Sequence, residues 1–340
     1  MTETSTPPEP RAARDWVRIL AQYRDPDTAR STFELAVSIL PFLGLWAVAI
    51  WLMDHSLLAA VLVSVLNGGF LIRLFGIQHD CGHGSFFNNR RLSDWVGRTL
   101  GVLTVTPYDV WRRAHAIHHS HAGDLSQRGI GDITTLTVAE YRSRGWLGRL
   151  QYRAYRHPLV MFGLGPGYQF LLMNRVPMGL MKDKRCWVSA MGTNLALAVL
   201  LGLVAWQFGW QALALVFLPS TLTAASIGVW LFYVQHQFEE THWDDGADWQ
   251  LHEAALHGSS HYDLPPVLRW FTVNIGIHHV HHLYSRIPFY RLPQVLKDHT
   301  ELVDCSRMTL LDSFRCARLH LWDEQARKLV SFASVRQAVA

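Results

Sequence analysis

Residues 187–235 read WVSAMGTNLALAVLLGLVAWQFGWQALALVFLPSTLTAASIGVWLFYVQ, and this stretch decides the fold because it contains no Asp, Glu, Lys or Arg. It divides at Gln211 into two blocks, 187–210 and 212–235. Each is longer than the roughly 20 helical residues that cross the hydrocarbon core of a bilayer. Buried helices of a soluble protein seldom run this long without a charge. The stretch therefore predicts a hairpin of two transmembrane helices.

A second pair of apolar blocks lies nearer the amino terminus, at residues 33–53 and 56–78. The first contains only one charged residue, Glu34, near its start. The second contains only Arg73, near its end, where a long side chain can reach the membrane surface. Together the four blocks predict an all-α integral membrane protein, with two transmembrane hairpins and a helical cytoplasmic cap.

Lys and Arg avoid the tips of the two expected hairpins. Of the 31 such residues, 5 precede residue 33, 15 lie in residues 79–186, 10 lie in residues 240–340, and the last is Arg73. Because basic residues concentrate on the cytoplasmic side of a membrane, we expect both termini and the middle segment to face the cytoplasm. The formal net charge of +4 then indicates a basic membrane-facing or partner-facing surface. No nucleic-acid-binding signature accompanies it.

The remaining segments divide the chain around these blocks. Residues 1–32 are polar and show no cleavable signal peptide, so we expect a cytoplasmic segment whose first ten or so residues are disordered. Residues 33–292 hold the four blocks and the motifs described below. Residues 293–340 read as a helical cytoplasmic tail, and no β alternation is evident from residue 236 onward.

Two smaller features of the sequence are also informative. Leu159–Asn174 is apolar, but it is too short to span a bilayer and is interrupted by Gly and Pro, so we expect an interfacial or re-entrant segment. The cysteines lack the paired spacing of a zinc or iron–sulfur site. We expect buried thiols at all four positions, Cys81, Cys186, Cys305 and Cys316.

Histidines carry the most informative pattern of the sequence. Residues 79–83 read HDCGH, residues 115–119 read HAIHH and residues 278–282 read HHVHH. On a helix, residues three and four apart share one face. This spacing groups His79 with His83, His115 with His118 and His119, and His278 with His281 and His282. His279 would point about 100° from its neighbour, so we interpret it as an outer-shell or surface residue.

The expected topology brings these clusters to one side of the membrane. The first hairpin returns the chain to the cytoplasm at His79, and the second returns it at His236. Eight imidazoles in three clusters, with His236 added, would then lie together in a region of low dielectric constant. Holding them there is unfavourable unless a metal takes their lone pairs.

The number and type of these ligands restrict the metal. Imidazole binds zinc, copper, iron and nickel, so ligand type alone leaves the choice open. Single zinc sites use three or four protein ligands, whereas eight or nine histidines suggest two metals. Hydrolytic two-metal sites normally contain carboxylate bridges, and Asp80 is the only carboxylate inside these clusters. The pattern favours oxidative attack on an unactivated C–H bond of a lipid.

Several longer motifs resemble the membrane fatty acid desaturases, most closely the bacterial and plastid acyl-lipid type that acts at the Δ12 or omega-6 position. The resemblance runs from about Arg73 to Leu292 and is specific in combination. It is carried by GIQHDCGHGSFF (76–87), WRRAHAIHH (111–119), GIGDITTLT (129–137), YVQHQFEE (233–240), ALHGSS (255–260) and NIGIHHVHHL (274–283).

This resemblance implies the metal ligands and the reaction. The family's three histidine boxes fall on the clusters above, and His236 matches an additional ligand from the end of the fourth span. The implied ligand set is His79, His83, His115, His118, His119, His236, His278, His281 and His282. It implies two non-haem irons, dioxygen as oxidant and the removal of two hydrogens from adjacent methylenes of a fatty acyl chain. Asn274 is not assigned, and His242, His252, His257 and His261 read as loop or outer-shell residues.

The implied partners are an acyl lipid of the bacterial inner membrane and a separate electron donor. The chain shows no iron–sulfur cysteine pattern and no fused haem domain, so a ferredoxin-like carrier would supply the electrons. Arg112, Arg113 and Arg128 are candidates for docking an acidic carrier. The same ligands would also suit a lipid hydroxylase or acetylenase. A metal transporter or sensor is a different class, which the uncharged spans at 187–235 argue against.

Overall fold

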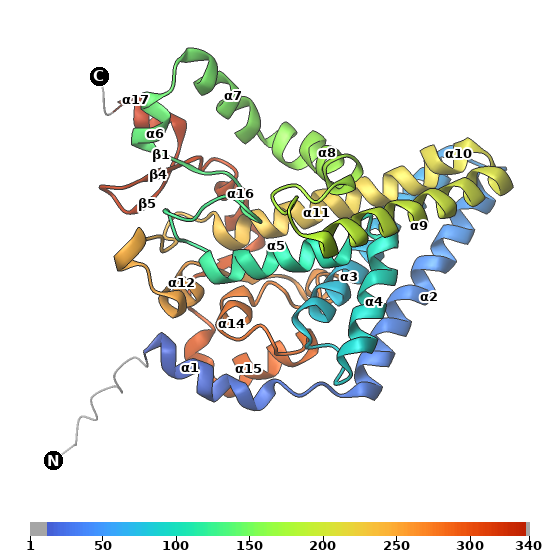
Figure 1. The fold of residues 1–340 in the computed structure, drawn as a ribbon, viewed down its shortest axis with the longest axis horizontal. Helices are drawn as coiled ribbons and strands as arrows, with labels where there is room; N and C mark the ends of the chain where they lie inside the picture. The colour runs from blue at the N-terminus through green and yellow to red at the C-terminus, as the bar shows by residue number, and fades with distance from the viewer. Residues whose placement is uncertain (1–11, 338–340) are drawn as a thin grey trace.

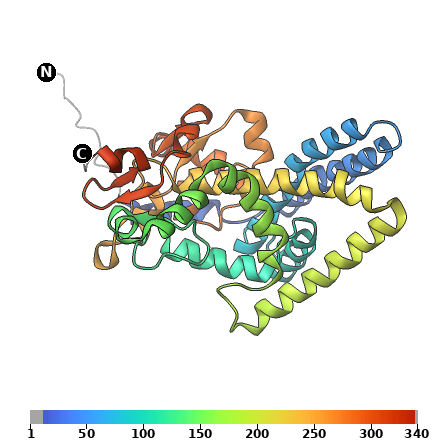
Figure 2. The same ribbon diagram turned by 90° about the horizontal axis from the view of Figure 1, so that it is seen from above.

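The computed structural model describes residues 12–337, so the predicted disorder of the first ten residues lies outside the described part of the chain. Four helices are long and apolar enough to cross a membrane. Figure 2 shows that they project to one side as two hairpins, one blue and one yellow-green. The four predicted spans are thereby confirmed as helices: α2 (Thr28–Leu52), α3 (Leu57–His83), α9 (Lys184–Phe208) and the continuous run from Trp210 to His236.

Capping residues explain where these helices begin and end. Asp27 starts α2 five residues before the predicted boundary, because its side chain accepts a hydrogen bond from the Arg30 amide at 2.9 Å. At the other end of the first hairpin, α3 continues past residue 78 to His83 and stops at Gly84, whose φ of 71° few residues other than glycine adopt. The extension of α3 places His79 and His83 on one regular helix.

The second hairpin turns at Gly209, which has a φ of 80°. After it the span widens into a π-helix just before Pro219, whose ring nitrogen cannot donate to the preceding turn. Large apolar side chains such as Leu195 and Trp206 remain exposed along these helices, as a lipid-facing surface requires. The run consists of α10 (Trp210–Ala212), η4 (Leu213–Phe217) and α11 (Leu218–His236).

Arg73 behaves differently from the expectation that it would reach the membrane surface. Its side chain is 1% exposed and forms an ion pair with the buried Glu34 of α2. It also donates to Ser38 Oγ at 2.9 Å and to the backbone carbonyl of Trp270, with its guanidinium 3.8 Å from the centre of the Trp270 ring. The snorkelling prediction was wrong because Glu34, one helix away, supplies a buried counter-charge.

Helices fill most of the segment between the hairpins. Figure 1 shows α5, which carries the second histidine cluster, beside α9 in the middle of the molecule. The predicted interfacial stretch forms a short π-helix followed by α8. The elements are α4 (Arg90–Leu103), α5 (Tyr108–His121), β1 (Leu136–Thr137), α6 (Val138–Ser143), α7 (Trp146–Arg156), η2 (Val160–Leu164), α8 (Gly165–Leu171) and η3 (Met173–Arg175).

The segment after the last span, and the short amino-terminal helices, cover the histidine end of the bundle (Figure 1). Before the first span lie α1 (Ala13–Leu20) and η1 (Ala21–Tyr23). After the last span lie η5 (Gly246–Asp248), α12 (Leu251–His257), β2 (His261–Asp263), α13 (Pro266–Phe271), α14 (His278–Leu283), η6 (Phe289–Arg291), α15 (Leu292–Asp298), η7 (Thr300–Leu302), β3 (Arg307–Thr309), α16 (Leu310–Cys316), β4 (Leu321–Asp323), β5 (Lys328–Val330) and α17 (Phe332–Gln337).

Short strands, which the sequence did not reveal, accompany the helices, and the molecule is mostly helical as expected. Three strands form a sheet in the order β1-β4-β5, with β1 parallel to β4 and β4 antiparallel to β5. Strands β2 and β3 pair in parallel. Each strand has only two or three residues. Alternation cannot reveal strands this short, because it needs at least four residues to be recognised.

The buried ion pair yields a stability prediction. Replacing Glu34 by Ala leaves the Arg73 charge buried without its carboxylate, and the free energy of unfolding should fall by about 3–5 kcal/mol. A thermal unfolding curve of the purified protein in detergent measures the change. Arg30→Ala is the matched control: it removes a second, half-exposed partner of Glu34 and should cost about 0–1 kcal/mol. Equal losses in the two variants would contradict a stabilising buried pair.

Candidate metal centre

Helix α3 presents the first two histidines. Because α3 stays regular to its last residue, His79 and His83 lie one turn apart, with ring centroids 4.6 Å from each other. Asp80, next to His79, accepts a hydrogen bond from the Phe289 amide at 2.8 Å and lies 3.2 Å from His79 Nδ1. These contacts fix the His79 ring so that Nε2 faces away from Asp80.

Helix α5 presents the second cluster, His115, His118 and His119, along its last two turns. Trp111 stacks on the His115 ring at 4.6 Å and lies edge-on to Phe75 of α3, which holds the two helices together beside the histidines. His118 is buried, whereas His115 and His119 are half-buried. The cluster therefore faces the interior of the cap.

The third cluster lies on α14, a helix of only six residues. The chain reaches it through Val273 and Asn274, which both have positive φ values of 48° and 54°. Gly76 of α3 makes this possible, because a Cβ at residue 76 would overlap the Val273 side chain. Close packing of the turn on α3 delivers His278, His281 and His282 to the ends of the other helices.

All nine predicted histidines meet at this point, and they separate into two groups. In each group one ring nitrogen per residue lies within 4.8 Å of the corresponding nitrogens of the others. The five-histidine group joins α3, α5 and α14, and consists of His79, His83, His115, His119 and His281. The four-histidine group joins α5, α11 and α14, and consists of His118, His236, His278 and His282.

The spacing of the nitrogens matches shared coordination. Two nitrogens about 2.1 Å from one ion and roughly 90° apart lie about 3.0 Å from each other. In the four-histidine group, His236 Nε2 lies 3.1 Å from His118 Nε2 and 3.0 Å from His278 Nε2. In the five-histidine group, His119 Nε2 lies 3.1 Å from the Nε2 atoms of His115 and His281. Both groups therefore have the spacing expected of ligands to a single ion.

Hydrogen bonds on the far side of the rings fix which nitrogen carries the proton. His118 donates from Nδ1 to Asp132 Oδ1 at 2.6 Å, and His236 donates from Nδ1 to the Gly258 carbonyl at 3.3 Å. In their neutral forms both rings then present unprotonated Nε2 atoms to each other. Two lone pairs facing at 3.1 Å repel unless a cation lies between them, so this arrangement fits a metal.

Burial supports the same conclusion. Burial first, and the neighbouring imidazoles second, hold the pKa values of the α5 and α14 histidines His115, His119, His278, His281 and His282 well below 6.5. These rings are therefore neutral at pH 7 and have lone pairs to give. The Nε2 atoms of His79, His83 and His282 are buried and have no hydrogen-bond partner in the described chain, as ligand atoms would.

Two of the histidines that were expected to lie in an outer shell, in a loop or on the surface are buried. His279 is fully buried rather than on the surface, and its Nε2 donates to the Leu302 carbonyl at 2.9 Å. His261 is buried in β2 and donates from Nδ1 to the Val303 carbonyl at 2.5 Å. Neither ring belongs to the two histidine groups, and the helical angle of His279 could not show that η7 packs on its side.

Other candidate residues also lie outside the two groups. Asn274 donates from Nδ2 to the Phe289 carbonyl at 3.1 Å. His242 and His257 contact carboxylates, Asp244 at 2.8 Å and Glu253 at 3.6 Å. All four cysteines are free thiols, of which Cys81, Cys186 and Cys316 are buried as predicted and Cys305 is half-buried.

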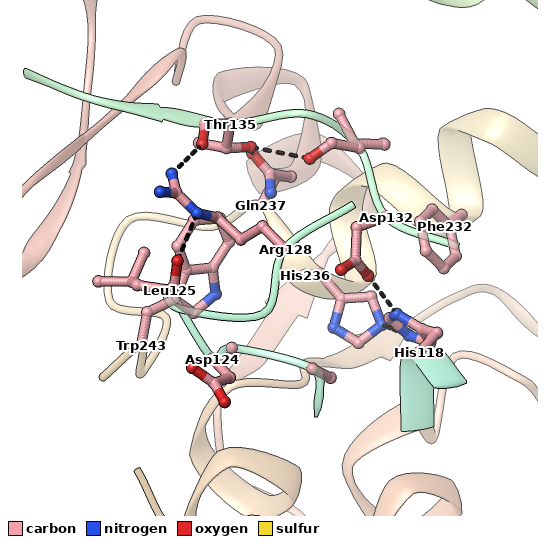
Figure 3. A pocket seen from close by; sticks show the side chains of 13 residues that line it. His118, Asp124, Leu125, Arg128, Asp132, Thr135, Phe232, His236, Gln237 and Trp243 are labelled. Atoms are coloured by element: carbon pink, nitrogen blue, oxygen red, sulfur yellow. Dashed lines mark hydrogen bonds and ion pairs between the residues drawn. The ribbon is translucent and has the colours of Figure 1, made fainter. Parts of the chain in front are cut away.

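A small cavity of about 30 Å³ adjoins the four-histidine group. Figure 3 shows His118 and His236 at its edge beside Phe232, with Asp132 reaching His118. Gln237 and Arg128 line the same space.

Sequence reasoning did not identify Asp132 as a functional residue. The loop that carries it crosses α5 closely at Gly131, where φ is 84° and a Cβ would lie 2.8 Å from the Ala114 carbonyl and 3.1 Å from His118 Cβ. The two glycines at positions 129 and 131 were the available signal, because a Gly-X-Gly turn before an acidic residue indicates a close backbone approach.

The matches to known proteins agree with this site. A family model described as fatty acid desaturase matches residues 55–310. The chain is 42% identical over 318 residues to a fatty acid desaturase of Bacillus subtilis, covering 93% of this chain and 90% of that protein. It is 27% identical to an sn-1 acyl-lipid omega-3 desaturase (ferredoxin) of Synechocystis, over 79% of this chain and 74% of that protein. It is also 29% identical to an sn-1 oleoyl-lipid 12-desaturase of Synechocystis, over 67% and 64%.

The family-model match over residues 55–310 includes all three histidine clusters and three of the four long apolar helices, α3, α9 and the run from Trp210 to His236. An enzyme of this kind is an oxidoreductase that acts on fatty acids, and its apolar helices make it a membrane protein. The chain belongs to the fatty acid desaturase family.

Proposed function

We propose that this protein is a dioxygen-dependent, di-iron desaturase that introduces a double bond into an acyl chain of a membrane lipid. The observation that carries the proposal is the pair of all-imidazole groups, of five and four residues, set side by side. In the overall reaction two adjacent methylenes each lose one hydrogen. Dioxygen takes these with two electrons and two protons from outside, and two waters leave.

The donor set supports two irons over other metals. Each group offers four or five nitrogens, more than the three that catalytic zinc uses. Neither group contains a carboxylate among its facing atoms, because Asp80 and Asp132 contact the Nδ1 side of their histidines. When bound, the two irons supply the oxidative chemistry that an unactivated C–H bond requires.

The protein's own residues would hold the metals, orient the ligand nitrogens and keep bulk water from the ligands. The nine imidazoles hold the metals, and Asp132 and the Gly258 carbonyl keep Nε2 of His118 and His236 directed inward. Phe232 covers both rings, with centroid distances of 4.9 Å to His118 and 5.4 Å to His236. An apolar wall next to these ligands favours a methylene chain and disfavours bulk water.

Names of relatives guide the choice of substrate. Two of them act, by name, on acyl lipids, one at the omega-3 position and one at the 12 position of an oleoyl lipid. We propose a glycerolipid acyl chain as substrate, with Δ12 or omega-6 as the position of the new double bond.

Location and electron supply are part of the same proposal. The Lys and Arg distribution supports an inner-membrane protein with its metal centre and termini in the cytoplasm. A ferredoxin-like donor is supported by relatives with ferredoxin in their names. Among the three arginines considered for docking, Arg113 is exposed, whereas Arg112 pairs with Asp94 at 2.9 Å and Arg128 with Glu140 at 2.6 Å. Arg113 is therefore the best placed of the three.

Product analysis tests the proposed reaction. The chain is expressed in a host that lacks polyunsaturated lipids, and mass spectrometry locates any new double bond in each lipid class. We expect a dienoic acyl chain with its second double bond at Δ12. A hydroxylated or triple-bonded product would replace the desaturase assignment. A double bond at the omega-3 position would correct only the position.

Removal of a ligand histidine tests the metal centre. His118→Ala and His281→Ala each take one nitrogen from a different group. Activity should fall by about two orders of magnitude or more, and bound iron should fall from about two per chain toward one. His121→Ala is the matched control, since His121 lies on α5 one turn from His118 and stacks on Trp249 instead. Iron analysis of the purified variants gives the answer, and equal iron in His118→Ala and His121→Ala would exclude His118 as a ligand.

Asp132 gives a graded test of ligand orientation. Asp132→Ala removes the acceptor that fixes the His118 ring, and the affinity for iron should fall by about 10–100-fold. Asp132→Asn keeps an oxygen acceptor and should lie between Ala and the native residue. Titration of the iron-loaded protein with a chelator measures the affinity. Identical affinities in both variants and the native protein would show that the ring needs no such support.

A further inference from the structure

Two short helices on the histidine side of the molecule expose large apolar side chains that the metal centre does not use. In α13, Val267 is 67% exposed, and in α16, Leu311 is 78% and Phe314 58% exposed. Exposed side chains of this size on two short helices indicate a surface that something apolar covers.

Each of the two helices follows a strand of the same two-stranded sheet. Strand β2 leads into α13, and β3 leads directly into α16. The two strands pair in parallel, so both helices leave the same edge of the sheet. Tyr262 of β2 fixes this unit, because its hydroxyl lies 3.0 Å from Ser313 Oγ of α16 and accepts from Trp230 Nε1 of α11 at 3.3 Å.

Ring contacts place the two helices against the membrane spans. Trp270 and Phe271 of α13 meet Phe70 of α3 edge-on, with centroid distances of 6.0 and 5.1 Å. Phe314 of α16 lies 5.6 Å from Trp230 of α11. At 1.5 Å per residue, Phe70 lies about 13 Å along α3 from His79, within the apolar part of the span.

Trp230 lies closer to the histidine end of its helix than Phe70 does. It precedes His236, the last residue of α11, by six residues, which correspond to about 9 Å. A bilayer that surrounds α3 and α11 would therefore reach α13 and α16 as well. Next to Phe314, the Arg315 side chain is 87% exposed, where a guanidinium can meet a lipid phosphate.

We propose that α13 and α16 form a wedge that inserts among the acyl chains of the membrane leaflet on the histidine side. The occupant of this surface is the phospholipid bilayer, because the exposed residues continue the lipid-facing surface of α3 and α11. The wedge adds a second insertion besides the four spans. This inference does not depend on the proposed reaction.

Depth-dependent quenching tests the wedge in the full-length protein. Leu311→Cys, and separately Val267→Cys, are labelled with an environment-sensitive NBD probe in a Cys305→Ser background and reconstituted into phosphatidylcholine and phosphatidylglycerol nanodiscs. Leu251→Cys is the matched control, because Leu251 is 43% exposed but lies on α12, which packs on α1 and α14 instead of the spans. Lipids with a doxyl quencher on the acyl chain and aqueous iodide are then compared.

We expect blue-shifted emission at residues 311 and 267, and quenching by doxyl lipid that is several-fold stronger than at residue 251. Iodide should quench the probes in the opposite order. Quenching of the 311 and 267 probes by iodide alone would overturn the proposal, since these residues would then face water. Blue-shifted emission that neither quencher affects would also overturn it, because a second copy of the chain would then cover the surface.

Discussion

Imidazole nitrogens from three helices, α5, α11 and α14, face one another across about 3 Å, and the rest of the structure depends on making that arrangement tolerable. Facing lone pairs repel, and burial together with neighbouring imidazoles keeps His119 and His278 neutral at pH 7, so protonation of these two rings does not relieve the repulsion. A pair of cations relieves it. The hydrogen bonds on the outer edges of His118 and His236 thus indicate a bound metal before any similarity is considered.

Two of the membrane spans end at the metal centre and supply histidines from their last turns. Helix α3 keeps its regular geometry as far as His83, and α11 ends at His236. The spans are held in register by polar contacts that are rare inside a bilayer, above all the Glu34–Arg73 pair, which also binds the Trp270 carbonyl. Through Trp270 that pair secures the segment leading to α14. The contacts that pack the spans together therefore also position the α14 histidines.

Much of this architecture could be predicted from the sequence because its signals are local. The uncharged length of residues 187–235 predicts helices directly, and the spacing of His115, His118 and His119 predicts a shared face. What could not be predicted depends on distant partners. The burial of Arg73 requires Glu34, the approach of Asp132 requires the turn at Gly131, and the burial of His261 and His279 requires η7. The short strands carry no periodic signal at all.

The way in which the four helices share the two histidine groups affects how the groups bind metal ions. Helix α3 contributes only to the five-histidine group and α11 only to the four-histidine group, whereas α5 and α14 contribute to both. An ion bound in either group would order the two shared helices. The second ion would then bind with a smaller loss of conformational entropy. Occupancy should then be cooperative, with empty and doubly loaded chains outnumbering singly loaded ones when the metal is scarce.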